Sequence, residues 1–157
     1  MSIRSYYQTH MDVIAKSIPS DYNPTIDEFV DLLLNCKGKI FFTGVGKNGH
    51  VAAKATSTFS SIGVSCFFID PVDSVHGDMG VINEEDILIA VSKSGNTEEL
   101  IHFLKHVKYK KCKIISIHSN PGNKSLKYSS LDINLNVRKE ADHLNIVPTC
   151  SIAVFTV

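Results

Sequence analysis

The chain has 157 residues, of which 43% are hydrophobic and 20% are charged, as expected for one globular domain with a substantial core. Sixteen basic and sixteen acidic residues give a formal net charge of zero, which argues against a general attraction to nucleic acid or to an anionic membrane. An anionic ligand would therefore have to be held locally, by a loop and a few side chains.

Two helices are expected before the sheet. Apolar residues at helical spacing predict a helix over residues 3–17, and a break at 19–24 follows it. Thr25 and Glu28 have the spacing of a capping box, and the apolar residues after them predict a second helix that continues to about Cys36.

Beyond residue 38 the chain alternates between strands and helices. The expected strands are continuous apolar runs, at 39–44, 64–69, 86–91, 112–118 and 131–137. Helices are expected between them, at 50–62 and 97–109. Continuous apolar runs are typical of parallel strands that are covered on both faces. The sequence therefore predicts an α/β fold, a three-layer α/β/α sandwich around a five-stranded parallel sheet of the flavodoxin-like kind.

Folds of this kind bind ligands at the carboxyl ends of the strands, near the point where the strand order switches. That rule places the chemistry after Thr43, Ile69, Val91 and His118. The longest connection, 70–85, is rich in polar groups and is a candidate active-site loop.

The turn GVGKNGH follows the first strand and opens a helix. Its glycines match the form G-x-G-x-x-G, but that pattern alone is weak evidence for a dinucleotide, and Asp70 is the nearest acidic residue that could contact a ribose. Lys47 in this turn is either solvated or meets an anionic or carbonyl oxygen of a ligand.

The turn SKSGNT follows the third strand and also opens a helix. Ser92, Ser94 and Thr97 offer hydroxyl groups, and Gly95 lets backbone N–H groups approach a ligand closely. Because helix amino termini attract phosphate, we predict a phosphate site here. Plain N-capping, by Asn96 or Thr97, would explain one of these hydroxyls but not all of them. The Walker pattern of nucleoside triphosphate sites is absent from this turn.

Acid–base groups surround the predicted phosphate site. Glu98 and Glu99 lie in the first turn of the following helix, and because adjacent helical residues point about 100° apart, one of them should face the pocket. HGD adds His76 in the polar loop, and KEADHL adds Glu140 and His143 after the fifth strand. These residues do not reproduce a compact metal-ligand spacing, so we predict no metal site.

The motifs GVGKNGH, SVHGDMGVI, SKSGNTEEL and KEADHLNIVPTCS, in this order, resemble the sugar isomerase (SIS) domain of the arabinose-5-phosphate isomerases of the capsule and lipopolysaccharide Kdo pathway. The resemblance runs from about Gly38 to the last residue. It implies an aldose–ketose isomerase that interconverts D-ribulose 5-phosphate and D-arabinose 5-phosphate without an organic cofactor. It also implies a homodimer or homotetramer whose subunits share pockets, and CMP-Kdo as a candidate end-product ligand.

The resemblance also implies roles for individual residues. Lys47, Glu99 and Glu140 should line the reacting end of the sugar, with His76 close by. Isomerisation removes a proton beside a carbonyl group and returns it to the neighbouring carbon, which requires a carboxylate base and a group that stabilises the enediolate. We expect either Glu99 or Glu140 to be the base, and Lys47 to be its electrostatic partner. The residues expected to bind the phosphosugar are Gly46, Asn48, Ser92, Lys93, Ser94, Gly95, Asn96, Thr97 and Thr149.

The chain departs from the family pattern in several places. The family usually reads S-N-S-G and A-C-P-L-G, where this chain has S-K-S-G, with Lys93, and A-D-H-L-N. A metal-binding histidine of some relatives falls on Asp70, which argues against a zinc site. The family's next helix, its H-P-G-G motif and its paired CBS domains would follow residue 157. We therefore expect one SIS domain over 1–157, truncated at its C-terminus and without CBS domains, with helices over 1–37 and the sheet core over 38–157. It is either a fragment, or a shortened homologue whose site is completed by another subunit or not at all.

Two other functions stay open. A non-catalytic, regulatory SIS module that binds a sugar phosphate would share the phosphate loop, and Lys93 favours it, whereas Lys47, His76, Glu99 and Glu140 together favour the enzyme. The second alternative is a SIS isomerase that acts on a longer sugar phosphate. No pair of helices with a basic face is visible, so we expect no nucleic acid partner.

The sequence predicts a cytoplasmic protein. The start MSIRSYYQTH has no basic flank leading into an apolar segment, so no signal peptide is expected. No apolar run approaches the roughly 20 residues that span a bilayer. The cysteines form no CxxC pair, and we expect buried, free thiols, as in a reducing compartment, at Cys36, Cys66, Cys112 and Cys150.

Overall fold

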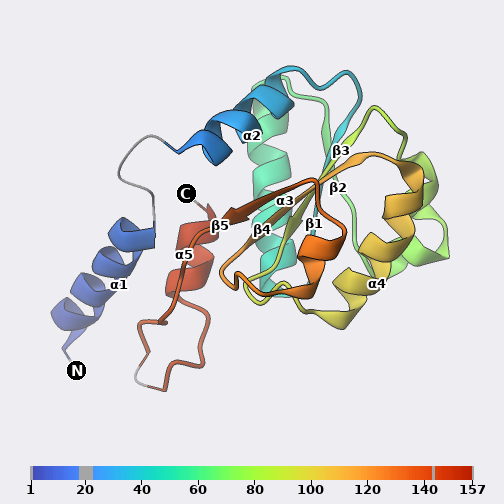
Figure 1. The fold of residues 1–157 in the computed structure, drawn as a ribbon. Helices are drawn as coiled ribbons and strands as arrows, with labels where there is room; N and C mark the ends of the chain where they lie inside the picture. Colours follow the sequence, from blue (N-terminus) through green and yellow to red (C-terminus); the bar gives the residue numbers. More distant parts are fainter. Residues whose placement is uncertain (1, 18–22, 143, 157) are drawn as a thin grey trace.

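The computed structural model describes residues 2–17, 23–142 and 144–156. One sheet of five parallel strands has the order β2-β1-β3-β4-β5 (Figure 1). The strands are β1 (Ile40–Gly44), β2 (Cys66–Phe68), β3 (Ile87–Val91), β4 (Lys113–His118) and β5 (Leu131–Asn134). This is the flavodoxin-like order, so the predicted fold class is confirmed.

Helices cover both faces of the sheet and make three layers. One face carries α2 (Pro24–Leu34), α3 (Lys47–Ser61) and α5 (Cys150–Thr156), which pack against strand residues such as Ile89 and Ile115. The other face carries α4 (Glu98–Val107). Residues of α4 at helical spacing, Leu100, Phe103 and Leu104, are fully buried there against Leu88.

The remaining helices lie at the edges of these layers. α1 (Ile3–Ser17) is set off from the sheet and contacts α5 (Figure 1). The polar loop after β2 contains two short 3-10 helices, η1 (Asp73–His76) and η2 (Asp78–Val81). Two more follow α4 and β4, namely η3 (Lys108–Lys110) and η4 (Lys124–Lys127).

Some predicted boundaries are wrong. α3 begins at Lys47 rather than at residue 50, and β5 ends at Asn134 rather than at residue 137. The predicted capping box at Thr25 is also wrong, because Asn23 is the N-cap of α2 and its Oδ1 accepts the N–H of Thr25 at 3.0 Å. The break expected at 19–24 falls mostly on residues 18–22, outside the described part of the chain.

The expectation that every strand is covered on both faces fails for β2. This strand has only three residues and lies at the edge of the sheet, and its side chains Phe67 and Phe68 are 48% and 38% exposed. An apolar run therefore does not by itself distinguish a central strand from a short edge strand.

The central core should dominate the stability of the fold. Replacing Phe103, which has no exposed surface, with alanine should lower the free energy of unfolding by about 3–5 kcal/mol, because lost burial and a cavity both contribute. Urea unfolding at neutral pH measures this loss. Phe67→Ala, at a half-exposed position, is the matched control and should cost clearly less; equal losses at the two positions would contradict the assigned burial.

Three of the four predicted buried thiols are buried, and all four are free. Burial, with the nearby charge of Asp86, raises the pKa of Cys112 to about 11, so this thiol stays protonated and unreactive. Cys36 is the exception, since it is only half buried, next to the loop that precedes β3.

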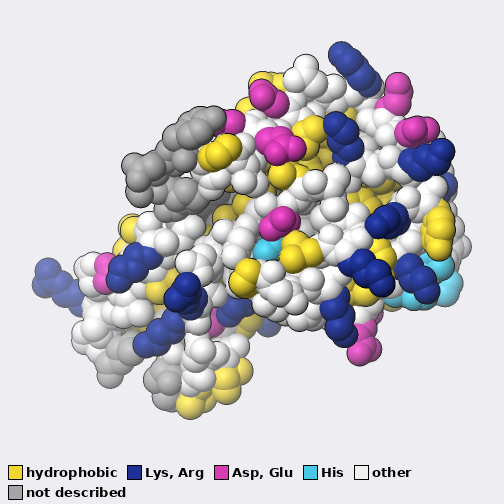
Figure 2. Space-filling view, viewed as in Figure 1, with side chains coloured by type: hydrophobic (Ala, Val, Ile, Leu, Met, Phe, Trp, Pro, Cys, Tyr) yellow, Lys and Arg dark blue, Asp and Glu magenta, His cyan; other side chains and the backbone are white. Residues whose placement is uncertain are grey.

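Charged side chains of both signs are mixed over the surface. On the face shown in Figure 2, Lys and Arg side chains gather most densely over the region of α4, with acidic side chains among them. Within the described stretches, no helix combines the length and the apolar character needed to cross a membrane.

Candidate functional site

The predicted ligand-binding turns meet where the strand order reverses. β1 pairs with both β2 and β3, and its last residue, Gly44, lies in register with Val91 at the end of β3. The chain leaves β1 into α3 on one face of the sheet and leaves β3 into α4 on the other. Such a switch leaves a crevice at the carboxyl ends of the two strands, where open α/β folds bind ligands.

A pocket of about 330 Å³ lies at this crevice. Its lining residues come from the segments that follow four of the strands: Asn48, Ser92, Lys93, Ser94, Thr97, Ser119, Asn120 and Val137. The first five are predicted by the sequence to bind the phosphosugar, and the structure brings them together. The other three are not among the predicted site residues, although the rule that places chemistry after His118 points to Ser119 and Asn120.

The turn after β3 has the shape of an anion cradle. Gly95, with a φ of 62°, donates its N–H to Ser92 Oγ at 3.1 Å, and Ser92 Oγ lies 3.3 Å from Thr97 Oγ1. Ser94 Oγ accepts the N–H of Asn96 at 3.1 Å. Thr97 is the N-cap residue of α4, but its side chain makes no capping hydrogen bond, so plain capping by Thr97 is the wrong interpretation. Hydroxyl groups thus surround the start of a helix whose dipole attracts anions.

The connection after β4 holds this cradle in place. Asn120 Nδ2 donates to the carbonyl of Ser94 at 3.1 Å, and the N–H of Ser125 donates to the carbonyl of Gly95 at 3.1 Å. A Cβ atom at Gly95 would lie 2.3 Å from the buried side chain of Asn123, so only glycine fits between the two loops. Contacts within the chain therefore hold the predicted phosphate-binding turn in this shape.

Packing accounts for the glycines of the turn after β1. A Cβ at Gly44 would lie 2.9 Å from the backbone of Asn48, and a Cβ at Gly49 would lie 2.8 Å from the carbonyl oxygen of Gly44. These glycines let α3 approach the end of β1 closely. Asp70 Oδ1 accepts the N–H of Val72 at 2.7 Å and so closes its own turn. Neither feature requires a dinucleotide.

Glu140 is a buried carboxylate in the segment between β5 and α5, with 1% of its surface exposed. It accepts the N–H groups of Thr149 and Ser151 at 2.8 and 3.1 Å, both of their hydroxyls, and Lys93 Nζ at 2.5 Å. Burial alone would raise the pKa of Glu140, but the hydrogen bonds from Lys93, Ser151 and Thr149 outweigh it and lower the pKa from 4.5 to about 2. A carboxylate held so firmly ionised is poorly suited to take a proton from carbon.

This carboxylate should make stability depend on pH. Because the pKa of Glu140 is lower in the folded than in the unfolded state, its contribution is complete above about pH 4.5 and is lost as the pH falls towards 2. We expect Glu140→Gln to lower the free energy of unfolding by about 3 kcal/mol at most at pH 7. The difference in this free energy from the unsubstituted protein should narrow between pH 5 and pH 2. Urea unfolding across this range measures the gap. Glu84→Gln, at an exposed position, is the control, and a gap independent of pH would contradict the assignment.

None of the predicted catalytic residues, Glu140 included, is among the residues that line this pocket. Lys47 begins α3, His76 ends η1 and Glu99 lies in the first turn of α4, and all three side chains are exposed. Within the described residues, these three form no hydrogen bond or ion pair with one another. Neither Glu98 nor Glu99 lines the pocket. Gly46, which has a φ of 59°, is exposed and does not line it either, although it lies two positions before the lining residue Asn48.

The family departure A-D-H-L-N builds the loop next to Glu140. Asp142 accepts backbone N–H groups in this loop, among them that of Ile146 at 3.1 Å, and Asn145 Oδ1 accepts the N–H of Glu140 at 2.6 Å. His143 lies outside the described residues. Among the residues that are described, no three His, Cys, Asp or Glu side chains lie close enough together to hold a metal ion.

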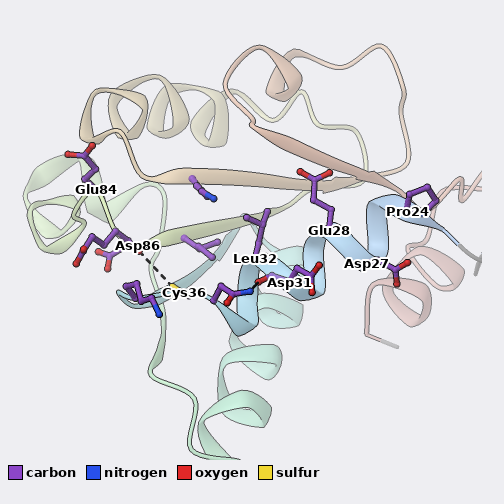
Figure 3. A pocket seen from close by; sticks show the side chains of 13 residues that line it. Pro24, Asp27, Glu28, Asp31, Leu32, Cys36, Glu84 and Asp86 are labelled. Carbon is purple, nitrogen blue, oxygen red and sulfur yellow. Dashed lines mark hydrogen bonds between the residues drawn. The ribbon is translucent and has the colours of Figure 1, made fainter.

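A larger hollow of about 620 Å³ lies elsewhere, at the amino ends of β3 and β4. Its lining is acidic: Asp27 and Asp31 of α2 stand on one side, and Glu84 and Asp86 on the other (Figure 3). These carboxylates would repel a phosphate, and ligands of such folds bind at the opposite ends of the strands. The smaller, hydroxyl-lined pocket is therefore the candidate site for an anionic ligand.

Comparison with known proteins points to one family. The SIS domain family matches residues 33–157. The chain is 42% identical over 115 residues to arabinose 5-phosphate isomerase KdsD of Francisella tularensis, covering 73% of this chain and 35% of that protein. It is 38% identical over 131 residues to the KdsD of Pseudomonas aeruginosa, covering 82% and 40%. The chain thus spans well under half the length of these curated relatives.

A solved structure is similar over almost the whole chain. The structure of c3406 from E. coli CFT073 in complex with arabinose 5-phosphate superposes with a TM-score of 0.92 at 30% sequence identity. The match covers 98% of this chain and 81% of that one. It therefore includes the strand ends that form the hydroxyl-lined pocket.

Proposed function

The chain belongs to the SIS domain family, and from that premise we propose that it is an aldose–ketose isomerase that interconverts D-ribulose 5-phosphate and D-arabinose 5-phosphate. The observation that carries the proposal is the pocket at the β1–β3 switch, with its hydroxyl cradle at the start of α4. The names of the curated relatives and the sugar phosphate bound in the similar structure support this choice of substrate.

In the proposed complex the phosphate group lies in the cradle. Ser92, Ser94 and Thr97 donate their hydroxyls to its oxygens, and the positive end of the α4 dipole faces it. Asn48 and Asn120, on either side of the cradle, offer amide groups to the sugar hydroxyls. A short sugar phosphate held in this way extends its reacting carbons towards the first turns of α3 and α4.

Glu99 is the base in this proposal. It removes a proton from C1 of the open-chain ketose, and the electron pair forms the enediolate, whose negative charge lies on O2. The proton then returns to C2, and the hydroxyl proton of O1 is transferred to O2, so that C1 becomes the aldehyde carbon and C2 carries a hydroxyl. Lys47 and His76 stabilise the charge that develops on oxygen. Glu140 is the weaker candidate for the base, because its lowered pKa and its full set of hydrogen bonds oppose proton uptake.

A neighbouring subunit would complete the site. Lys47, His76 and Glu99 are exposed in the single chain, whereas catalytic groups work best where water is excluded. We propose that the protein is a homodimer or homotetramer in which a second copy covers this end of the pocket. The cytoplasmic location and the binding of CMP-Kdo stay predictions.

One experiment separates the enzyme from a non-catalytic binding module. Purified protein is mixed with ribulose 5-phosphate and the formation of arabinose 5-phosphate is followed, while calorimetry measures the binding of both sugars. The isomerase predicts turnover and binding. Binding without turnover would replace the proposal with a regulatory sugar-phosphate module, and the absence of both would remove the phosphosugar site altogether.

A further inference from the structure

The pocket contains one charged side chain. Among the described residues that line it, only Lys93 carries a charge, and the others are hydroxyl, amide or apolar groups. A sugar phosphate carries a charge of roughly −1.5 to −2 at neutral pH, and the net charge of the whole chain is zero. The cation that opposes the ligand charge in this pocket must therefore be local, and Lys93 is in place to supply it.

The ammonium group of Lys93 is held in a defined position. Its Nζ lies 2.5 Å from Glu140 Oε1, and its side chain is 38% exposed whereas that of Glu140 is 1% exposed. The carboxylate is itself immobile, because Thr149 and Ser151 donate backbone and hydroxyl groups to it. A lysine ammonium has three donors, and Glu140 is its hydrogen-bond partner in the described structure, which leaves two donors for a ligand.

Glu140 has no capacity left for a substrate. A carboxylate offers about four acceptor positions, and the donors from Lys93, Thr149 and Ser151 already fill them. Its connection to the pocket therefore runs through Lys93, which lies 47 positions away in the sequence. Glu140 thus acts on Lys93, and Lys93 acts on the ligand.

A second polar group in the same pocket lacks a partner. Ser119 Oγ is buried and, within the described structure, makes no hydrogen bond, although Ser119 lines the pocket. The N–H of Ser119 donates to the carbonyl of Lys93 at 3.0 Å, so the two residues are fixed side by side. A buried hydroxyl without a partner is unfavourable, and a ligand oxygen or hydroxyl beside Lys93 would satisfy it.

We propose that Lys93 is a ligand-contacting residue that binds the anionic group of the sugar phosphate, and that Glu140 is the positioning residue that holds it there. Charge-assisted hydrogen bonds are about twice as strong as neutral ones, so this contact adds affinity that the hydroxyl cradle alone does not provide. The inference rests on the proposed function only in taking a sugar phosphate as the ligand, and it requires no turnover.

Calorimetric titration with arabinose 5-phosphate, and separately with inorganic phosphate, tests the role of Lys93. Lys93→Met should weaken the binding of both ligands roughly ten- to hundredfold, as expected for the loss of one hydrogen bond to a charged group. Lys139→Met removes the same charge from an exposed position nearby and should change affinity less than twofold. Unchanged binding by Lys93→Met, an equal loss in both variants, or no binding of either ligand by the unsubstituted protein would overturn the proposal.

A double-variant comparison tests the positioning role of Glu140. Glu140→Gln alone should weaken binding several-fold, but in the Lys93→Met background it should weaken it no further, because the carboxylate acts through the lysine. A purely structural role would give the same loss in both backgrounds, and that result would overturn the positioning assignment. The double variant leaves no unpaired buried charge, so it carries the test of Lys93 if Lys93→Met alone does not fold. If the unsubstituted protein binds the sugar phosphate and the variants weaken binding as expected, but no protein isomerises ribulose 5-phosphate, the isomerase proposal fails and the role of Lys93 and Glu140 still holds.

Discussion

Glu99→Gln should reduce the isomerisation rate by roughly 10²–10⁴-fold, the usual contribution of a general base, and leave the binding of arabinose 5-phosphate unchanged. Glutamine keeps the shape of the side chain but cannot accept the proton that leaves C1. Glu99 is exposed in the first turn of α4, two residues after Thr97, so its replacement removes no buried contact. The effect should therefore appear in kcat and not in stability.

The adjacent glutamate provides the control for this prediction. Glu98 is also exposed and also lies in the first turn of α4, but it points about 100° away around the helix. Glu98→Gln should keep nearly full activity while removing the same charge from the same end of the helix. Equal losses in the two variants would mean that the charge of the helix start, rather than proton transfer by Glu99, matters for the rate.

Gly95→Ala should abolish phosphosugar binding and destabilise the fold. A Cβ at this position would lie 2.3 Å from Asn123 Cγ and Oδ1, and a φ of 62° is itself unfavourable for alanine. The left-handed backbone costs about 1–2 kcal/mol and the overpacking about 1–3 kcal/mol. Displacement of the cradle should relieve much of this cost, and the hydroxyl groups would then no longer be in place to bind the phosphate. Calorimetry with arabinose 5-phosphate measures this loss of binding.

Gly122→Ala is the matched control for the cradle. Gly122 lies in the loop that contains Asn123, but a Cβ there would meet no atom within 4 Å. We expect this variant to bind and unfold like the unsubstituted protein. If Gly95→Ala also bound arabinose 5-phosphate normally, the turn after β3 would not be the phosphate site.

The layered architecture was predictable because its signals are local. Continuous apolar runs such as 86–91 identify strands buried on both faces, and glycine-rich turns after two of them identify the ligand-binding ends. The errors lie where a run is short or a cap is ambiguous. β2 reads as a central strand although Phe67 and Phe68 are partly exposed at the sheet edge, and Asn23 rather than Thr25 caps α2.

The site was predictable only in part, because several of its features depend on contacts between distant segments. The hydroxyls of SKSGNT are visible in the sequence, and the structure places them in one pocket. The pairing of Lys93 with Glu140 joins positions 47 residues apart, so no local pattern contains it. Ser119 follows a strand end that the sequence does indicate, but its contact with Lys93 depends on β4 lying beside β3 in the sheet.

That pairing also changes the interpretation of two residues. Lys93 is expected from the sequence to bind the phosphosugar and, as a departure from the family pattern, to favour a binding module; in the structure it is the one charged residue among the described residues that line the pocket. Glu140 appears as a candidate base, yet its buried hydrogen bonds hold it ionised and lower its pKa to about 2. Burial and long-range hydrogen bonding, which a sequence does not display, underlie the roles that we propose for these two residues.

The most direct test of the proposed isomerase is to incubate the protein with ribulose 5-phosphate in D₂O and follow the sugars by NMR. The proposed mechanism predicts arabinose 5-phosphate with deuterium at C2, because a proton held on a carboxylate base exchanges with solvent before it returns to carbon. Arabinose 5-phosphate without deuterium at C2 would contradict proton transfer through an exchangeable base, and no arabinose 5-phosphate from protein that binds the substrate would contradict the isomerase.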